Sequence, residues 1–66
     1  MTDTKWLVVR TDFYDSVFLV EEDLEEEGAA RCVREMTARN HHQFYDAHSY
    51  PPGGKGELLK RLLVHH

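Results

Sequence analysis

Two short apolar runs near the N-terminus constrain the fold most, because the residues between them favour a turn. Trp6–Val9 and Val17–Val20 are rich in β-branched and aromatic side chains, and Tyr14–Ser16 lies between them. This order is typical of a β-hairpin. Alternation along the first strand puts Phe13 on the inner face and leaves Trp6 on the other, partly polar face, where we expect Trp6 to be exposed.

An acidic run follows the hairpin and predicts the start of a helix. Six of the seven residues Glu21–Glu27 carry a carboxylate. Asp23 and Glu26 have the spacing of a capping box, and carboxylates in a first turn complement the helix dipole, so we expect the helix to begin near Leu24. Asn40 is typical of a helix end. The apolar positions of this helix form a stripe at helical spacing, made of Leu24, Ala29, Ala30, Val33 and Met36.

The remainder of the chain predicts one more strand and a final helix. Alternating side chains over residues 41–50 indicate a third strand. Residues 51–56 are rich in proline and glycine and predict a linker, because proline lacks a backbone donor and glycine favours irregular backbone. A helix over residues 57–64 follows, with a stripe of leucines on one side and Lys60 and Arg61 on the other.

These elements predict a single small α+β domain over residues 1–66. We expect a three-stranded antiparallel sheet, formed by the hairpin and the third strand, with a helix on one face and a short C-terminal helix. The second face stays open unless the last helix or a partner covers it. A chain of 66 residues buries only about 60 % of its unfolded surface, so a catalytic pocket would use up most of the core. This favours a binding module over an enzyme.

Cysteine content and hydropathy limit the cellular location that we expect for the protein. Cys32 is the single cysteine, which excludes an internal disulfide and is typical of a reducing compartment, so we expect the cytoplasm. The first residues lack the pattern of a signal peptide, and the longest apolar run, Val17–Val20, is too short to span a bilayer, so no membrane association is expected. His65 and His66 fit either a native end or a purification tag. No cofactor is expected.

Charge is concentrated in the acidic run. Removing its six carboxylates from the net charge of −4 leaves +2. Such charge separation predicts a protein partner with a basic surface, for example a nucleic-acid-processing protein of a host cell. The candidate partner-binding carboxylates are Glu21, Glu22, Asp23, Glu25, Glu26 and Glu27. An alternative role is only to stabilise the helix and keep the protein soluble.

Direct nucleic-acid binding is disfavoured by an isoelectric point near 5.6. The basic residues that could form a local patch are Arg31, Arg34, Arg39, Lys55, Lys60 and Arg61. The alternative for these side chains is a solvated helix face.

Seven aromatic residues exceed what so small a core can cover. Exposed Trp and Tyr beside charged residues are typical of binding hot spots, which makes Trp6, Tyr45 and Tyr50 candidate partner-binding residues. An open edge strand, or the leucine stripe of the final helix, also permits pairing with a second copy. A homo-oligomer is therefore an open alternative.

Three residues of the third strand are weak candidates for metal ligands. His42, Asp46 and His48 share one strand face, and Cys32 would supply a fourth donor. The alternative is a half-exposed polar face without metal. A histidine beside Asp46 also suits acid–base chemistry, but Ser49 lies on the opposite strand face and no nucleophile is evident. We therefore assign neither a metal site nor a catalytic residue.

Two segments resemble a known family. His41–Tyr45, followed by Pro-Gly-Gly-Lys-Gly at residues 52–56 and Leu-Leu-Lys-Arg-Leu-Leu at 58–63, resembles the strand and final helix of HicA-type mRNA-cleaving toxins. The resemblance covers about 25 residues and implies a catalytic histidine at His41 or His42. The N-terminal hairpin, and the helix directly before the motif, differ from the family pattern.

We therefore expect a small acidic, non-enzymatic protein–protein binding module, of the kind that phages and other mobile elements encode as accessory or inhibitor proteins. Its size and hairpin–helix–strand order are similar to those of small phage inhibitors of bacterial RNA polymerase. A HicA-like ribonuclease using His41 or His42, and a histidine-based metal-binding module, are the alternatives.

Overall fold

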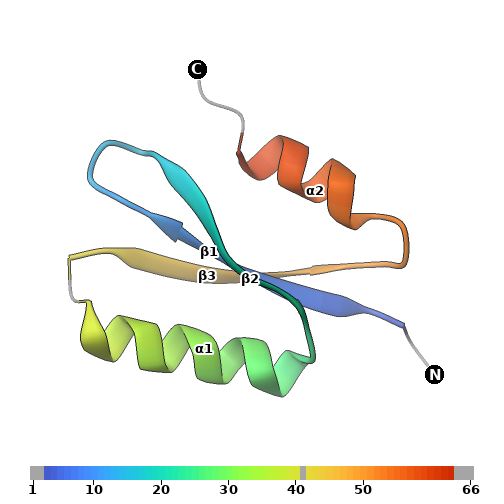
Figure 1. The fold of residues 1–66 in the computed structure, drawn as a ribbon, viewed down its shortest axis with the longest axis horizontal. Coiled ribbons are helices and arrows are strands. Elements are labelled where there is room, and N and C mark those ends of the chain that lie inside the picture. The colour runs from blue at the N-terminus through green and yellow to red at the C-terminus, as the bar shows by residue number, and fades with distance from the viewer. Residues whose placement is uncertain (1–2, 41, 64–66) are drawn as a thin grey trace.

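The structure is a computed structural model that describes residues 3–40 and 42–63. Within these residues the chain forms two strands, a helix, a third strand and a second helix, which confirms the predicted α+β fold (Figure 1). The strands are β1 (Lys5–Thr11), β2 (Val17–Leu24) and β3 (Phe44–Tyr50). The helices are α1 (Glu26–Arg39) and α2 (Lys55–Leu62).

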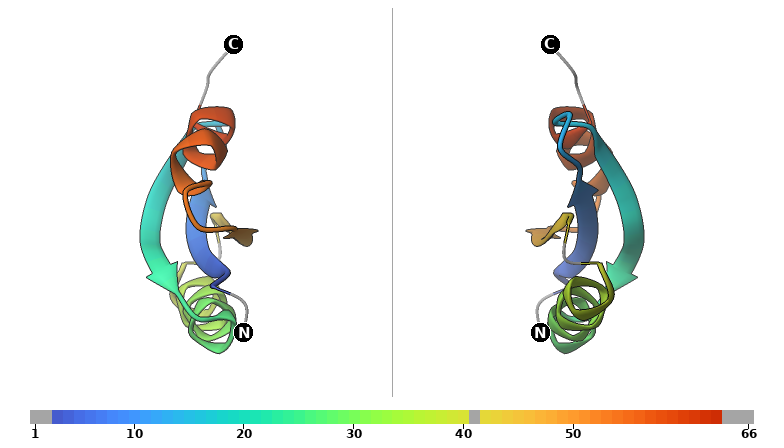
Figure 2. Two further views of the ribbon diagram at one scale, coloured as in Figure 1. Left: turned by 90° about the vertical axis from the view of Figure 1, so that its right-hand side faces the viewer. Right: turned by 90° about the vertical axis from the view of Figure 1, so that its left-hand side faces the viewer.

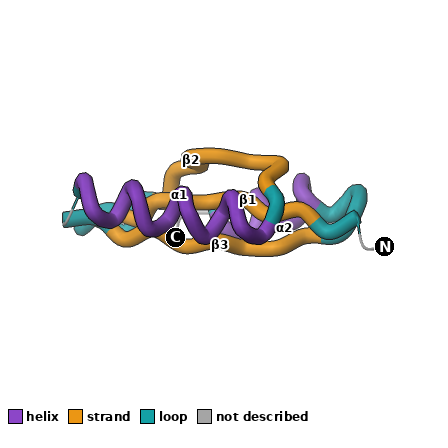
Figure 3. The backbone as a smooth tube through the Cα atoms, turned by 90° about the horizontal axis from the view of Figure 1, so that it is seen from below, coloured by secondary structure: helices purple, strands orange, loops and turns teal. Residues whose placement is uncertain are grey.

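The sheet is antiparallel with the strand order β2-β1-β3, so β2 and β3 are its two edges (Figure 3). β3 pairs one-to-one with β1, from Lys5 opposite Tyr50 to Thr11 opposite Phe44. β2 pairs with β1 less regularly, because its register shifts between Trp6 and Val8 and again between Val8 and Val9. Such shifts mark β-bulges, which bend and twist the strand that contains the extra residue.

The hairpin turn is held by one aspartate. Asp12 Oδ1 accepts hydrogen bonds from the backbone N–H groups of Tyr14 at 2.8 Å and Ser16 at 3.0 Å. Asp15 in the same turn has φ 61°, a left-handed conformation that aspartate tolerates better than most residues. The predicted turn is therefore confirmed, with its first anchoring residue two positions earlier than Tyr14.

The two helices cover opposite faces of the sheet, which gives three layers (Figures 1 and 2). Three consecutive residues of β1, Leu7, Val8 and Val9, are buried because this strand has neighbours on both sides and a helix over each face. The face that the sequence left open is thus covered by the chain's own final helix. The leucine stripe, which could also have paired with a second copy, packs on this face through Leu58, Leu59 and Leu62.

The core consists of two clusters, one under each helix. Below α1, the buried side chains of Val8, Ala29 and Tyr45 pack with partly buried residues of the sheet and helix, which are Trp6, Val20, Leu24, Cys32, Val33, Met36 and Ala47. Below α2, the buried side chains of Leu7, Val9 and Tyr50 pack with Val17, Leu19, Leu58, Leu59 and Leu62. Helical and strand periodicity predicted most of these positions, although Ala30 of the expected stripe is exposed.

The predicted start of α1 is wrong. Leu24 is the last residue of β2, and the N-cap of α1 is Glu25, which makes no side-chain capping hydrogen bond within the described residues. Asp23 does not cap the helix because it has φ 57° and its carboxylate binds elsewhere. The capping box between Asp23 and Glu26 is therefore not formed.

The other element bounds differ by a few residues. Within the described residues the third strand starts at Phe44, because His42 and Gln43 belong to the turn before it. The first predicted strand position, His41, lies outside the described residues. The C-terminal helix begins at Lys55, inside the predicted linker, and ends at Leu62. The last predicted helical position, Val64, lies outside the described residues.

The molecule is a thin slab, with Cα atoms that extend over 37 × 29 × 10 Å. The helix, sheet and helix layers are stacked along the intermediate dimension, as Figure 1 shows in a view down the shortest axis. The short dimension therefore runs across the three strands. Among the described residues, no helix has both the length and the apolar character needed to cross a membrane.

Candidate functional site

The acidic run spans the end of β2 and the start of α1, and we call its carboxylates the acidic corner: Glu21, Glu22, Asp23, Glu25, Glu26 and Glu27. All six side chains belong to exposed residues. The corner combines the irregular end of an edge strand with the N-terminus of a helix, where Glu26 and Glu27 occupy the first turn. Carboxylates at that position are favoured by the unpaired N–H groups of the helix.

Two lysines of the chain form ion pairs with three of the six carboxylates of the corner. Lys55 Nζ lies 3.0 Å from Glu22 Oε1 and 3.0 Å from Asp23 Oδ2, and Lys5 Nζ lies 3.0 Å from Glu25 Oε1. These contacts raise the pKa of both ammonium groups. Over residues 3–40 and 42–63, the remaining three carboxylates, Glu21, Glu26 and Glu27, have no ion-pair partner.

A buried tyrosine fixes the position of Asp23. Tyr50 Oη donates a hydrogen bond to Asp23 Oδ1 at 2.6 Å and accepts one from the Asp23 N–H at 2.9 Å. The hydrogen bonds from Tyr50 and Lys55 hold the pKa of the Asp23 carboxyl below its usual range. Burial, followed by the bond to Asp23, raises the pKa of Tyr50. This network joins the ends of β2 and β3 to the start of α2, and it holds the backbone of the acidic corner in place at Asp23.

Trp6 lies next to the acidic corner but is not a fully exposed residue. It is half-buried, because it packs against the cluster below α1 and has Leu24 of β2 as its cross-strand neighbour. Its accessible part lines a shallow hollow together with Thr4, Ser49 and the two carboxylates Glu25 and Glu26. The structure therefore brings Trp6 and the acidic residues together, as a partner-binding surface would require.

The two tyrosines predicted at the surface are buried. Tyr50 is 5 % exposed beneath α2 and takes part in the Asp23 network, whereas Tyr45 is 7 % exposed below α1. The expectation of exposure is wrong for both, because two helices, one on each face, cover the alternating residues of β3. Tyr45 also pairs across the sheet with Arg10, towards the opposite end of the strands from the acidic corner.

The aromatic residues that are exposed lie at the hairpin end. Phe13 and Tyr14 in the turn are 74 % and 89 % exposed, and Phe18 and Phe44 are exposed on the two edge strands. The Arg10 guanidinium stacks over the Phe18 ring at 4.8 Å, a cation–π contact. Sequence alternation placed Phe13 inside because it continued β1 beyond Thr11. The turn residues Asp12 and Asp15 were the signal that the strand had already ended.

The candidate metal ligands are not brought together. His42 lies in the turn before β3, and Asp46 and His48 lie on the sheet face that α2 covers. Cys32 belongs to α1 and packs against the opposite face of the sheet. Among the described residues no three His, Cys, Asp or Glu side chains are grouped to hold a metal ion. Burial raises the pKa of the Cys32 thiol, which disfavours the reactive thiolate.

Of the two histidines that the HicA resemblance points to, His42 is exposed in the turn that leads to β3. His41 lies outside the described residues.

Comparison with known proteins gives no relative: no protein-family model, no curated protein and no solved structure matches this chain.

Proposed function

We propose that this protein is a non-enzymatic protein–protein binding module that docks through its acidic corner on the basic surface of a nucleic-acid-processing protein. The observation that carries the proposal is a set of three exposed carboxylates, Glu21, Glu26 and Glu27, that have no ion-pair partner among residues 3–40 and 42–63. The other three carboxylates of the corner pair with Lys5 and Lys55.

The internal ion pairs support this role, because they leave the outer carboxylates free while fixing the backbone that presents them. Lys55 approaches from α2 and Lys5 from β1, so both lysines approach from the chain's own elements. Glu26 and Glu27 extend from the first turn of α1. A preformed negative surface speeds encounter with a positive one and loses less entropy on binding than a mobile acidic tail.

Trp6 supplies the one apolar side chain of an otherwise polar hollow next to these charges. Interfaces of useful affinity combine an aromatic anchor with a polar rim, and Trp is enriched among the residues that dominate binding energy. Here the accessible part of Trp6 is flanked by Glu25 and Glu26. Lysine- or arginine-rich nucleic-acid channels offer the matching chemistry, since they are built to bind phosphate groups of the same charge sign as these carboxylates.

The test compares two variants with the same loss of charge. Glu26→Gln with Glu27→Gln removes two carboxylates from the acidic corner, whereas Glu35→Gln with Glu57→Gln removes two exposed carboxylates elsewhere, Glu57 also in a helix first turn. Tagged proteins are used to capture partners from bacterial lysate with and without nuclease treatment, and the affinity for the captured protein is then measured.

We expect one host protein to be captured by the native chain and by the Glu35/Glu57 variant. Its affinity for the Glu26/Glu27 variant should be about tenfold lower at low salt, and this difference should narrow as salt is raised, because the lost term is electrostatic and is screened. Equal affinity for both variants would exclude the acidic corner as the docking surface. Recovery of RNA without a protein would favour the ribonuclease alternative.

A further inference from the structure

The two edges of the sheet differ in how they are protected. β2 has two register shifts and ends in carboxylates, and irregular, charged edges resist pairing with further strands. β3 keeps a one-to-one register with β1 over Phe44–Tyr50. In a regular antiparallel pair, every second residue of the outer strand directs its N–H and C=O groups away from the sheet. β3 therefore presents a straight row of backbone donors and acceptors.

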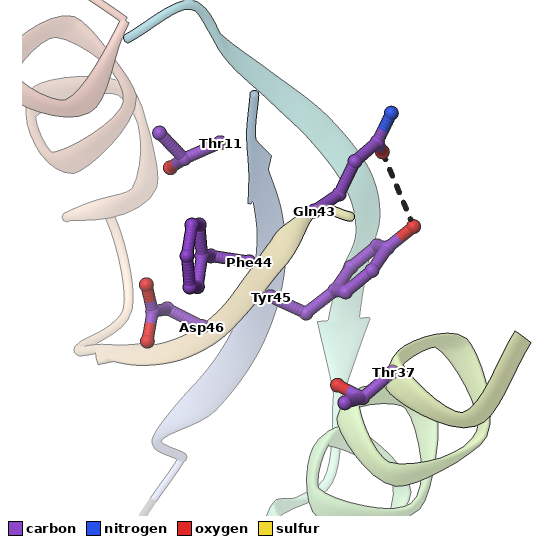
Figure 4. A pocket seen from close by; sticks show the side chains of 6 residues that line it. All are labelled: Thr11, Thr37, Gln43, Phe44, Tyr45 and Asp46. Carbon is purple, nitrogen blue, oxygen red and sulfur yellow. Dashed lines mark hydrogen bonds between the residues drawn. The ribbon is translucent and has the colours of Figure 1, made fainter. Parts of the chain in front are cut away.

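A hollow of about 440 Å³ lies at the start of this strand. Its lining includes four consecutive residues, Gln43, Phe44, Tyr45 and Asp46, together with Thr11 and Thr37. Figure 4 shows Phe44 and Asp46 on one side of the strand and Tyr45 on the other, towards α1. Because successive residues of a strand point to opposite faces, a hollow lined by Phe44, Tyr45 and Asp46 reaches both sides of β3 at its first three residues.

We propose that β3 pairs antiparallel with β3 of a second copy of this chain, with the two-fold axis at Ala47. This register extends the sheet to six strands across the dimer. It places Asp46 opposite His48 of the second copy, Phe44 opposite Tyr50, and Tyr45 opposite Ser49. By symmetry each of these pairs occurs twice.

The strand is complementary to itself in this register. Asp46 and His48 flank Ala47 at equal distances in the sequence and lie on the same face, so the two-fold axis brings an acidic side chain opposite a basic or hydrogen-bonding one. Ala47 is the small residue that permits close approach at the axis. An interface in which one surface supplies both halves of each contact is what a two-fold dimer requires.

Exposure of Phe44 gives independent support. Its side chain is 65 % exposed on the face that α2 covers, next to the hollow. In the proposed dimer its backbone lies opposite that of Tyr50 from the second copy, and the added strand covers part of the exposed Phe44 ring. The hollow itself is filled by the added strand, and Thr37 of α1, which lines it, has a short side chain.

The width of the sheet also favours a second copy. Within the described residues only β1 has strands on both sides, and three of the six buried core residues, Leu7, Val8 and Val9, belong to it. Pairing at β3 gives that strand the same surroundings as β1. The acidic corner lies on β2 and α1 and remains accessible, so this inference does not depend on the proposed function.

The test is the oligomeric state of the full chain, measured by sedimentation over a range of concentrations up to about 1 mM. We expect a dimer that Asp46→Lys weakens by about tenfold or more, because lysine then faces His48 of the second copy. Glu21→Lys makes the same change of charge on the other edge and should leave the dimer unchanged. Asp46→Lys with His48→Asp reverses the pair and should restore it, and circular dichroism checks that each variant is folded.

Amide hydrogen exchange identifies the surface. In the dimer, protection of alternate amides within Phe44–Tyr50 should rise with protein concentration, while amides of β2 should not change. A chain that stays monomeric at the highest concentration would overturn the proposal. So would a dimer that is insensitive to Asp46→Lys and leaves the β3 amides unprotected, since it would use another surface.

Discussion

α1 and α2 cover opposite faces of the same sheet, but they are held there in different ways. α1 has 14 residues and is joined to the sheet by apolar packing around Val8 and Tyr45. α2 has 8 residues, and its contacts with Leu7 and Val9 are supplemented by the polar network of Tyr50, Asp23 and Lys55. An isolated helix of that length is not stable in water. The short helix therefore depends on both a leucine stripe and a polar anchor at its first residue.

The largest expected effect tests the apolar part of this comparison. Leu7→Ala removes a fully buried side chain beneath α2, and we expect a loss of about 3 kcal/mol in the free energy of unfolding. Urea denaturation at fixed protein concentration measures it. A loss of less than about 1 kcal/mol would mean that α2 does not pack on this face in solution.

The two buried tyrosines give a matched test of the polar part. Tyr50→Phe removes a hydroxyl that both donates to and accepts from Asp23, and we expect it to cost about 1.5 kcal/mol. Tyr45→Phe removes a hydroxyl whose bond to Gln43 Oε1 is long, at 3.4 Å, so its effect should be much smaller. Hydrogen exchange should show loosening of α2 in the first variant alone. Equal effects in both would show that the network does not anchor α2.

Acid should affect the α2 face through Asp23. Because the folded-state pKa of this carboxyl is lowered, its contribution to stability is complete above its unfolded pKa of about 3.9 and is lost as the pH falls through the folded value. Between pH 5 and about 3 the native protein should therefore lose more stability than Asp23→Asn, which has no carboxyl to titrate there. Parallel pH profiles for the two proteins would contradict a role for the Asp23 charge.

Sequence reasoning found the elements but not the structure of the acidic run. Strand and helix periodicity depends on local side-chain patterns, and it located the hairpin, α1, β3 and α2 to within a few residues. The run Glu21–Glu27 resembles a capped helix start locally. In the folded chain Asp23 binds Tyr50 and Lys55, which are 27 and 32 residues away, and such long-range competition leaves no local signal.

The candidate site could be predicted only in part, because local patterns reveal charge but not long-range burial. The acidic corner was expected because charge density can be counted in a sequence, and its three unpaired carboxylates are part of it. Burial of Tyr50 depended on whether α2 would dock, which the sequence left open, whereas Tyr45 is buried beneath α1. The exposed aromatic residues at the hairpin end, Phe13 and Tyr14, were missed because alternation alone does not locate the last residue of a strand.

Because β1 is apolar on both faces, burial alone selects its pairing register only weakly. Leu7 and Val9 face α2 while Val8 faces α1, so a slip of one residue would exchange apolar side chains for apolar side chains and be weakly penalised by burial. The choice of register must then come from the hairpin turn, where Asp12 binds two backbone N–H groups. An exposed aspartate-containing loop, remote from the core, thus decides which helix each face of the sheet receives.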